Sequence, residues 1–197
     1  MKRPLARLAA AVTLLLALSL AACPLPQPLP EVARTDGGVV TSLRFRLETV
    51  LPSDPIVPVA KTCPDGGVPQ FNVSAALEDP DTVERVEARW FVDYRVDAPD
   101  ARRSDDIPGS GDPADPVRLV PPLGSQPFVF AMPAFDPADP TTRVHVLEVV
   151  VCSVGFTPLG NDPPGTLYPN RTPQLGFEAA QIYRWIFEYV DQNGRCN

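Results

Sequence analysis

Four carboxylates at one short turn are the side chains whose types and spacing best suit a chemical role. Glu78, Asp79, Asp81 and Glu84 fall within seven residues. Carboxylate oxygens are hard ligands, which Ca²⁺ prefers. Their spacing matches neither the EF-hand loop nor a glycine-rich calcium repeat. We therefore expect no cofactor, and these four residues are the candidate ligands if calcium binds.

Catalysis finds less support in the sequence. His145 is the single histidine and lies among valines, which favours a core or edge position over a general base. The motifs of serine hydrolases, P-loops, dinucleotide-binding folds and zinc proteases do not occur. Acidic residues beside prolines in turns are normally solvated, and Asp105, Asp106, Asp112 and Asp115 are expected to lie in a flexible, soluble loop. We predict a non-enzymatic protein; the alternative is an enzyme that uses loop carboxylates, for instance on glycans.

Cysteine is the remaining reactive residue type. Cys63, Cys152 and Cys196 follow Cys23, and no CxxC pattern occurs among them. With a single histidine, this set disfavours a structural zinc site. In an oxidising compartment, the last three cysteines would give one disulfide and one remaining thiol. The residues alone leave open which two of them pair.

The first 23 residues have the layout of a secretory signal. Lys2, Arg3 and Arg7 supply positive charge, and residues 8–20 are almost entirely apolar. This apolar core is shorter than the about 20 residues that cross a bilayer. The next residues, Leu20-Ala21-Ala22-Cys23, resemble the bacterial lipobox.

The lipobox resemblance implies a lipid-anchored protein. It implies removal of residues 1–22 and attachment of diacylglycerol, and of a further acyl chain such as palmitate, to Cys23. Each buried CH₂ contributes about 0.8 kcal/mol and one chain alone holds only marginally, so several chains at one residue give stable attachment. Pro24, rather than Asp, follows the cysteine. In Gram-negative lipoproteins this implies the outer membrane, on its periplasmic face or at the cell surface.

The charge of the processed chain limits its partners. Removal of residues 1–22 takes away three cations and no anions, which changes the formal net charge from −7 to −10. Such an acidic chain disfavours nucleic acid and electrostatic docking on anionic lipid. Membrane attachment should therefore come from the acyl chains.

Proline shapes both the tether and the domain. Residues 23–39 contain four alternating prolines, which favour an extended polyproline II tether of up to ~50 Å. Residues 40–197 have the length of one domain. The chain has 26 prolines in 197 residues, well above the usual share of about 5%. This content disfavours long helices and favours short strands joined by stiff loops.

Alternating apolar residues predict an all-β domain. In the first strand, Leu43, Phe45 and Leu47 should face the core. The run 143–156 is apolar on both faces, so we expect a central strand covered on both sides. The predicted strands are 41–51, 71–77, 86–94, 117–120 (weak), 128–132, 143–156 and 182–190, and the predicted loops are 52–69, 96–126 and 157–176.

Aromatic residues in the last strand share one face. This pattern favours a core position for Tyr183, Trp185, Phe187 and Tyr189. Phe91, however, lies on the face opposite Trp90. The alternative is therefore that part of this aromatic surface is exposed and binds protein.

The strand pattern resembles an immunoglobulin-like or fibronectin type III-like antiparallel β-sandwich of about seven strands. In this resemblance 71–77 is strand B, 86–94 is strand C with the core tryptophan Trp90, 143–156 is strand F and 182–190 is strand G. The long Pro-, Asp- and Gly-rich loops depart from the compact family pattern, and an open barrel or jelly roll is the alternative.

The resemblance also implies which cysteines pair. It places Cys63 before strand B and Cys196 after strand G at the same pole, which implies a Cys63–Cys196 disulfide and a buried Cys152 thiol. The competing pair is Cys63–Cys152. It further implies that Asn161 or Asp162 shares the opposite pole with the acidic turn.

Together these features predict an outer-membrane lipoprotein whose domain binds or braces another envelope protein without catalysis. The alternative from a different class is a surface module for adhesion, which binds sugar or peptide. Sandwich folds carry many unrelated functions, so the fold by itself does not choose between them.

Overall fold

Nine β-strands and one short 3₁₀ helix make up the secondary structure of residues 43–153, 155–174 and 180–197, which the computed structural model describes. The elements are β1 (Arg44–Leu51), β2 (Ile56–Ala60), β3 (Gln70–Glu78), β4 (Val86–Val92), β5 (Ala101–Ile107), β6 (Val117–Val120), β7 (Phe128–Ala131), η1 (Pro140–Arg143), β8 (Val144–Cys152) and β9 (Gln181–Val190). The all-β prediction is confirmed for these residues.

The described residues belong to one unit, Val40–Asn197. The signal peptide predicted at 1–22, the lipidated Cys23 and the tether predicted at 23–39 lie outside the described residues. Within the described ranges, no helix combines the length and the apolar character that a membrane crossing requires.

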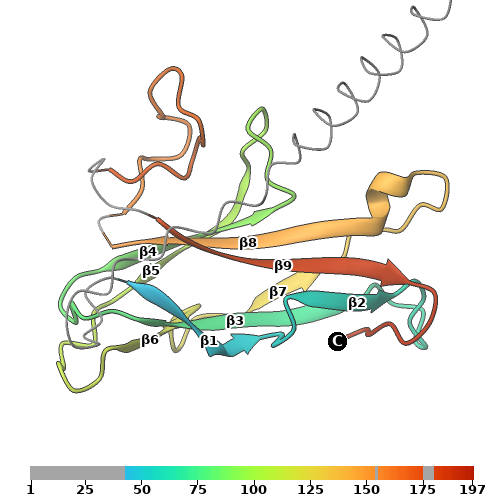
Figure 1. Cartoon of the computed structure of the whole chain (residues 1–197), viewed down its shortest axis with the longest axis horizontal. Coiled ribbons are helices and arrows are strands. Elements are labelled where there is room, and N and C mark those ends of the chain that lie inside the picture. The colour runs from blue at the N-terminus through green and yellow to red at the C-terminus, as the bar shows by residue number, and fades with distance from the viewer. Residues whose placement is uncertain (1–42, 154, 175–179) are drawn as a thin grey trace, which may run out of the picture. The chain divides into compact units, whose positions relative to one another are not determined.

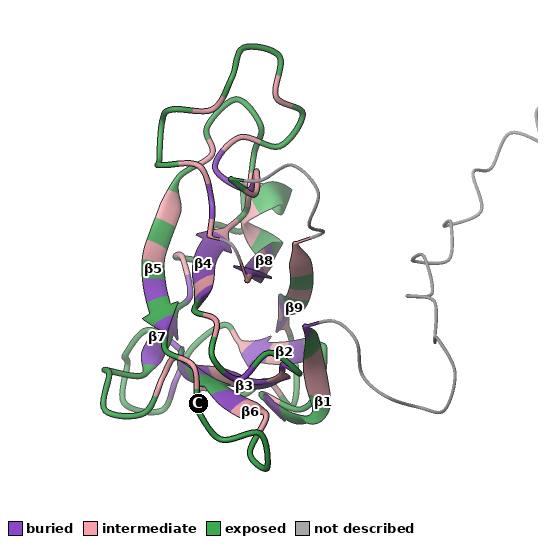
Figure 2. Cartoon of the chain, turned by 90° about the vertical axis from the view of Figure 1, so that its left-hand side faces the viewer, coloured by how far each residue is buried: buried purple, intermediate pink, exposed green. Residues whose placement is uncertain are grey.

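The strands form two sheets that face each other across the core (Figures 1 and 2). The five-stranded sheet has the order β2-β9-β8-β4-β5, and the four-stranded sheet has the order β1-β3-β6, with β7 also paired to β3. Every pair is antiparallel except β2 with β9, which is parallel. The chain therefore has the layered arrangement of a β-sandwich.

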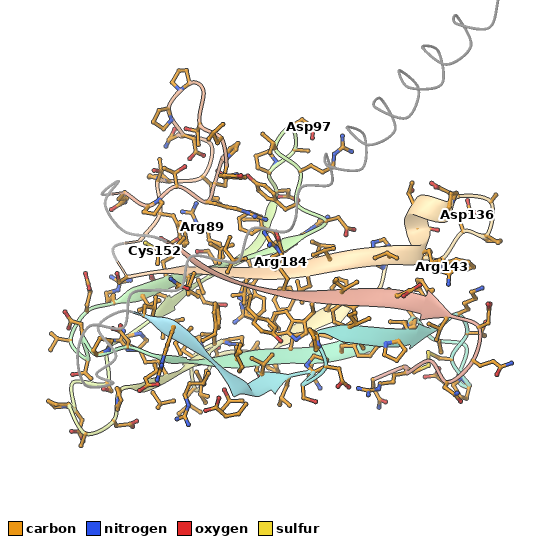
Figure 3. The ribbon with its side chains drawn as sticks, in the orientation of Figure 1. Arg89, Asp97, Asp136, Arg143, Cys152 and Arg184 are labelled. Atoms are coloured by element: carbon orange, nitrogen blue, oxygen red, sulfur yellow. A yellow bond between two sulfur atoms is a disulfide. The ribbon has the colours of Figure 1, made fainter. Side chains whose placement is uncertain are left out.

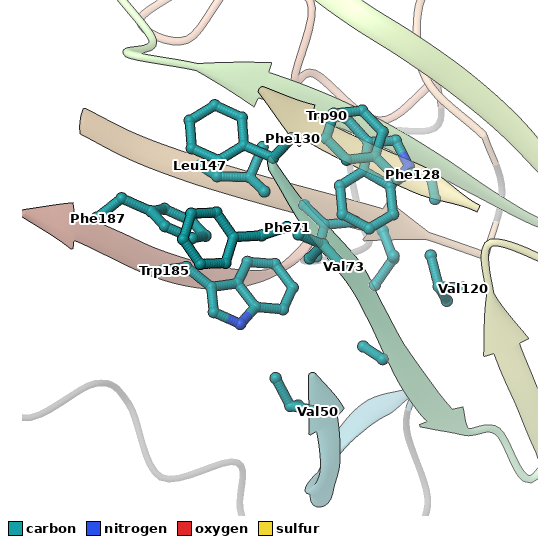
Figure 4. Packing of buried hydrophobic residues seen from close by; sticks show 14 of the residues in the cluster. Val50, Phe71, Val73, Trp90, Val120, Phe128, Phe130, Leu147, Trp185 and Phe187 are labelled. Atoms are coloured by element: carbon teal, nitrogen blue, oxygen red, sulfur yellow. The ribbon is translucent and has the colours of Figure 1, made fainter. Parts of the chain in front are cut away.

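The apolar core lies between the sheets and is rich in aromatic rings (Figure 4). Trp90 of β4 stacks on Phe128 of β7 with ring centroids 4.4 Å apart, which joins the two sheets. Phe187 of β9 contacts Phe71 and Phe130 at 5.0 and 4.6 Å. Such pairs add roughly 0.5–1.5 kcal/mol beyond the burial of their area.

Most of the predicted faces are confirmed. In β3 the alternating residues Phe71, Val73, Ala75 and Leu77 are all buried. In β9 Trp185, Phe187 and Tyr189 lie in the core, with Tyr183 packed against it. Strand β8 runs between β4 and β9, and its buried side chains lie on both faces, as the doubly apolar pattern predicts.

The first strand departs from its predicted face. Leu47, expected in the core, is 65% exposed, and Val50 is buried instead. The pairing of β1 with β3 shifts register between Arg46 and Leu51. Between these two pairs β1 advances five residues while β3 advances two, from Ala76 to Ser74. Because side chains alternate along a strand, an odd number of extra residues moves the following side chains to the other face.

Two strands form where the sequence predicted loops. In β5, Asp105 and Ile107 are buried, and the Trp90 indole Nε1 donates a hydrogen bond to Asp105 at 2.9 Å. The interpretation of Asp105 as a solvated loop residue is therefore wrong. In β2, Val57 and Val59 fill core positions on either side of Pro58. Pairing with a neighbouring strand overrides the local composition in both segments.

The C-terminal segment closes one side of the sandwich. Arg195 forms a parallel bridge with Val59, and the amide of Gln70 in the other sheet donates to the carbonyl of Cys196 at 2.9 Å. Cys196 forms a disulfide with Cys63, the pairing that the resemblance implied. Cys152 is buried and lies outside this disulfide.

We predict that reduction of Cys63–Cys196 lowers the free energy of unfolding by about 2–5 kcal/mol, because the disulfide restricts the unfolded chain over a separation of 133 residues. Urea unfolding of the oxidised and the dithiothreitol-treated full chain measures this difference. The difference in stability between oxidised and reduced protein should persist in Cys152→Ala and disappear in the double variant Cys63→Ala/Cys196→Ala. Equal stability with and without reductant contradicts the prediction.

Candidate functional site

Charged side chains are buried on the outer face of the five-stranded sheet, away from the apolar core. Two loops rise on this face, one following β4 at residues 93–100 and one within residues 155–174 (Figures 1 and 2). Arg89 and Arg184 lie on the same face (Figure 3). Residues 93–100 and 155–174, together with the parts of β4, β8 and β9 beneath them, form one polar and aromatic contact zone, which we call the loop platform.

Glu148 is the central charge of the loop platform. It lies in the middle of β8, is 5% exposed, and pairs in register with Arg184 of β9. Its carboxylate accepts hydrogen bonds from Arg184 and from Arg171 of the covering loop. A buried carboxylate without partners is strongly unfavourable, and the two guanidinium groups supply these partners at this position.

Arg171 also packs on aromatic rings. Its guanidinium carbon lies 3.2 Å from the ring centroid of Tyr94 and 4.7 Å from that of Phe91. Burial lowers the pKa of Arg171 to about 10, whereas Tyr94 raises this pKa and Arg184 lowers it further. Burial also raises the pKa of Tyr94, against an opposite effect of Arg171. Arg171 is therefore charged at neutral pH and binds Glu148 as a cation.

Phe91 is fully buried beneath this loop and not part of an exposed aromatic surface. It packs with Val150, Cys152 and Phe156 in a second, smaller apolar cluster on the outer face of the sheet. The exposed-surface alternative for Phe91 is therefore wrong, because the loop after β8 folds back over the strand that carries it.

A second ion pair attaches the loop to β4. The buried Arg89 donates to Glu87 at 2.8 Å and to the carbonyl of Asn170 at 2.9 Å. The other carboxylate oxygen of Glu87 accepts from the amide of Phe156 at 2.9 Å. Glu87 and Arg89, two residues apart on the same face of β4, thus hold both ends of the covering loop.

Asn170 is the hub of the loop platform. It has a φ of 61°, in the left-handed region that asparagine tolerates better than most residues. Its amide donates to Asp162 at 2.6 Å, its side-chain oxygen accepts from the amide of Gly160 at 3.0 Å, and its side-chain nitrogen donates to the carbonyl of Pro99 at 2.5 Å. The last bond joins the two loops, as does the 2.8 Å bond from the Tyr94 hydroxyl to Pro169.

The braced loop presents apolar side chains to solvent. Leu167 is 78% and Tyr168 60% exposed. On the uncovered part of the same sheet, Ile56 and Ile186 are exposed and paired in register across β2 and β9, with Ile182 also exposed on β9. An exposed leucine and tyrosine on a braced loop, and exposed isoleucines on the same sheet, are suited to binding another macromolecule.

The candidate calcium ligands are held by other partners. Glu78 pairs with Arg44 at 2.7 Å, and Asp79 pairs with the buried Arg118 at 2.9 Å. Asp81 accepts hydrogen bonds from the amides of the turn that follows it, and Arg118 also donates to the carbonyl of Glu84. No cluster of three or more metal-ligating side chains occurs in the part of the chain that the structure describes. The metal hypothesis thus gains no support from the geometry.

The expected loop contribution to that acidic turn is not seen either. The carboxylate of Asp162 accepts from the amide of Asn170 within its own loop. Asn161 is an exposed residue of the same loop. Local hydrogen bonding within the loop after β8 thus engages Asp162 in the loop platform.

His145 occupies a buried position in β8, as the sequence favoured. Its Nδ1 lies 2.6 Å from a carboxylate oxygen of Asp93, whose other oxygen accepts from the amide of Val146. The Nε2 is buried and has no hydrogen-bond partner among the described residues. The geometry is that of a histidine held in place within the fold.

Sequence reasoning missed the two arginine contacts of Glu148 and the role of Asn170. One signal was present: Glu148 interrupts an apolar run that was expected to be covered on both faces. A carboxylate in such a run requires cationic partners. The sequence does not identify Arg171, however, because 23 residues separate it from Glu148.

Comparison with known proteins identifies no relative. No protein-family model, no curated protein and no solved structure matches this chain.

We predict that Asn170→Ala lowers the opening free energy of residues 157–171 by about 2–4 kcal/mol, through two lost side-chain hydrogen bonds and the strain of alanine at positive φ. Native-state hydrogen exchange of the amides in this loop measures the change. The matched control is Asn161→Ala in the same loop, expected within about 0.5 kcal/mol of the parent. Equal effects of the two substitutions contradict the role of Asn170.

Proposed function

We propose that this protein is a lipid-anchored envelope lipoprotein whose immunoglobulin-like domain binds another envelope protein and acts without catalysis. The observation that carries the proposal is the loop platform, where buried ion pairs hold a loop that exposes Leu167 and Tyr168 over a sheet that also exposes isoleucines.

The strand order supports an immunoglobulin-like type. In that fold strands C, F and G share one sheet, with F between C and G, and strand B lies in the other sheet. Here β8 lies between β4 and β9, whereas β3 lies in the opposite sheet. Trp90 on β4 occupies the core, as expected for strand C. One departure is that β6 and β7 both pair with β3, where one strand is usual.

The lipid anchor is supported by the N-terminal residues. The basic start, the apolar run and Leu20-Ala21-Ala22-Cys23 together favour acylation of Cys23. The acidic charge of the processed chain makes acyl chains the expected means of attachment. Pro24 favours the outer membrane as the location, in a Gram-negative envelope.

The chemistry of the exposed residues favours a protein partner. Tyrosine and large aliphatic residues are the usual anchors at protein interfaces, whereas surrounding polar groups orient them. The loop platform places such anchors on a backbone held by buried hydrogen bonds. Less conformational entropy is therefore lost on binding than for an unbraced loop.

We predict that Cys23→Ser releases the protein from the membrane fraction, because it removes the thiol that accepts diacylglycerol. Detergent phase partitioning of intact cells and metabolic labelling with a fatty-acid analogue measure the change. Cys152→Ser, a cysteine change within the domain, should keep both membrane partition and label. Unchanged partition of Cys23→Ser contradicts the anchor.

We further predict that a photo-crosslinking residue at Leu167 or Ile186 forms an adduct with the same envelope protein in intact cells. Leu119, an exposed apolar residue of the other sheet, is the matched control position and should not yield this adduct. Asn170→Ala should weaken the adduct from Leu167, because it releases the loop. Equal adducts from Leu119, or none from Leu167 and Ile186, contradict the proposed binding surface.

A further inference from the structure

Strand β7 has an open edge. It pairs with β3 along one side, through Phe128 to Ala131, and no strand pairs with its other side among the described residues. The opposite flank of the sandwich differs, because there the C-terminal segment pairs with β2. The amide of Arg195 donates to the carbonyl of Pro58 at 2.8 Å, and Arg195 forms a bridge with Val59. The sandwich is therefore closed along one side and open along the other.

Hydrogen bonding fixes which backbone groups of β7 face outward. The amide of Met132 donates to the carbonyl of Pro69 at 3.0 Å, so Met132 and Pro69 form a hydrogen-bonded pair of the antiparallel ladder. Such pairs recur at every second residue, so Phe130 and Phe71 form the next one. Consistently, the amide of Gln70, opposite Ala131, donates away from β7, to Cys196. The N–H and C=O groups of Val129 and Ala131 thus point to the open edge.

A groove of about 430 Å³ runs beside these outward groups. Most of its lining is apolar, and the residues that form it are Val92, Arg102, Phe128, Val129, Phe130, Ala131 and Pro133. The side chain of Arg102 is 57% exposed, and its carboxylate partner Asp100 lies 3.4 Å away, a distance longer than in the other arginine pairs of the domain. Arg102 can therefore meet a further carboxylate.

The sequence of β7 does not protect this edge. Edge strands are commonly guarded by charged side chains, bulges or prolines within the strand. Strand β7, from Phe128 to Ala131, contains neither a charged residue nor a proline. Pro127 and Pro133 lie outside the strand and flank its two ends. A strand added here would therefore be short.

We propose that the β7 edge binds an extended segment of a partner protein by strand addition, with an apolar side chain in the groove and an acidic residue against Arg102. An extended backbone supplies donors and acceptors in the alternation that Val129 and Ala131 present. The positive charge of Arg102 selects a carboxylate. This site is separate from the loop platform, and it stands or falls independently of the function proposed above.

Fluorescein-labelled heptapeptides test the site on the full chain in detergent. Their sequence is Glu-Thr-Xaa-Thr-Xaa-Thr-Glu, with Xaa as Val, Ile or Phe, so that either end presents a carboxylate on the apolar face. We expect saturable binding by fluorescence anisotropy, weakened about tenfold when both Glu are replaced by Gln. No saturable binding of any of the three peptides up to about 1 mM, a very weak limit, overturns the proposal.

N-methylation of the peptide gives a readout that leaves the protein unaltered. In strand addition, alternate peptide amides face β7 and the others face solvent. Methylation of one alternate set should therefore abolish binding, whereas methylation of the other set should leave it within about threefold, the scale of non-specific effects. Equal effects of the two sets overturn strand addition.

Val129→Pro is the matched change in the protein. It removes an outward N–H that makes no bond to β3, so the ladder is retained, and we expect affinity to fall about tenfold. Val129→Thr keeps the N–H and should bind as the parent does. Arg102→Gln should remove the preference for Glu over Gln peptides. Peptide binding that neither Val129→Pro nor Arg102→Gln affects overturns the proposal. A concentration-dependent dimer of the parent protein that Val129→Pro dissociates also overturns it, because a second copy of the chain would then occupy the edge.

Discussion

A carboxylate in the centre of an otherwise apolar sheet constrains the outer half of this structure. Glu148 lies in β8, between two neighbouring strands, so it has no route to bulk water along the sheet. Its charge is compensated only if cations reach it from the same face. Arg184 provides one from β9, and Arg171 provides the other from a loop that must fold over the sheet. The loop platform follows from this requirement.

The same requirement explains why the covering loop is rich in proline yet tightly held. Proline limits the conformations of the loop and so lowers the entropy lost when it is ordered. The hydrogen bonds of Asn170 and the pair formed by Arg89 and Glu87 then fix its position. A loop held in this way can expose Leu167 and Tyr168 without collapsing onto them, which is the physical basis of the proposed binding surface.

The two flanks of the sandwich differ in how their strand edges are completed. The disulfide and the segment after β9 join β2 to the opposite sheet on one flank. On the other flank, Arg103 of β5 donates to the carbonyl of Gln126, just before β7, and leaves the edge of β7 itself unpaired. Chain connectivity thus covers one edge and exposes the other.

The sequence by itself determined the features that depend on near neighbours in the chain. The alternation of Phe71, Val73 and Ala75 and the doubly apolar run of β8 predicted strands and their buried faces, because each side chain must alternate across a pleated backbone. The candidate lipid anchor at Cys23 likewise rests on adjacent residues. The disulfide between Cys63 and Cys196 followed only from the resemblance to a known fold.

The tertiary structure decided what depends on partners far apart in the chain. The bulge that exposes Leu47 arises from pairing with β3, and the polar strand β5 is stabilised by β4 and by the indole of Trp90. In the acidic turn, Asp79 pairs with Arg118, which comes from a different strand. The sequence likewise did not identify Arg171 as a partner of Glu148, because the fold, and not the spacing in the sequence, sets the distance between two charges.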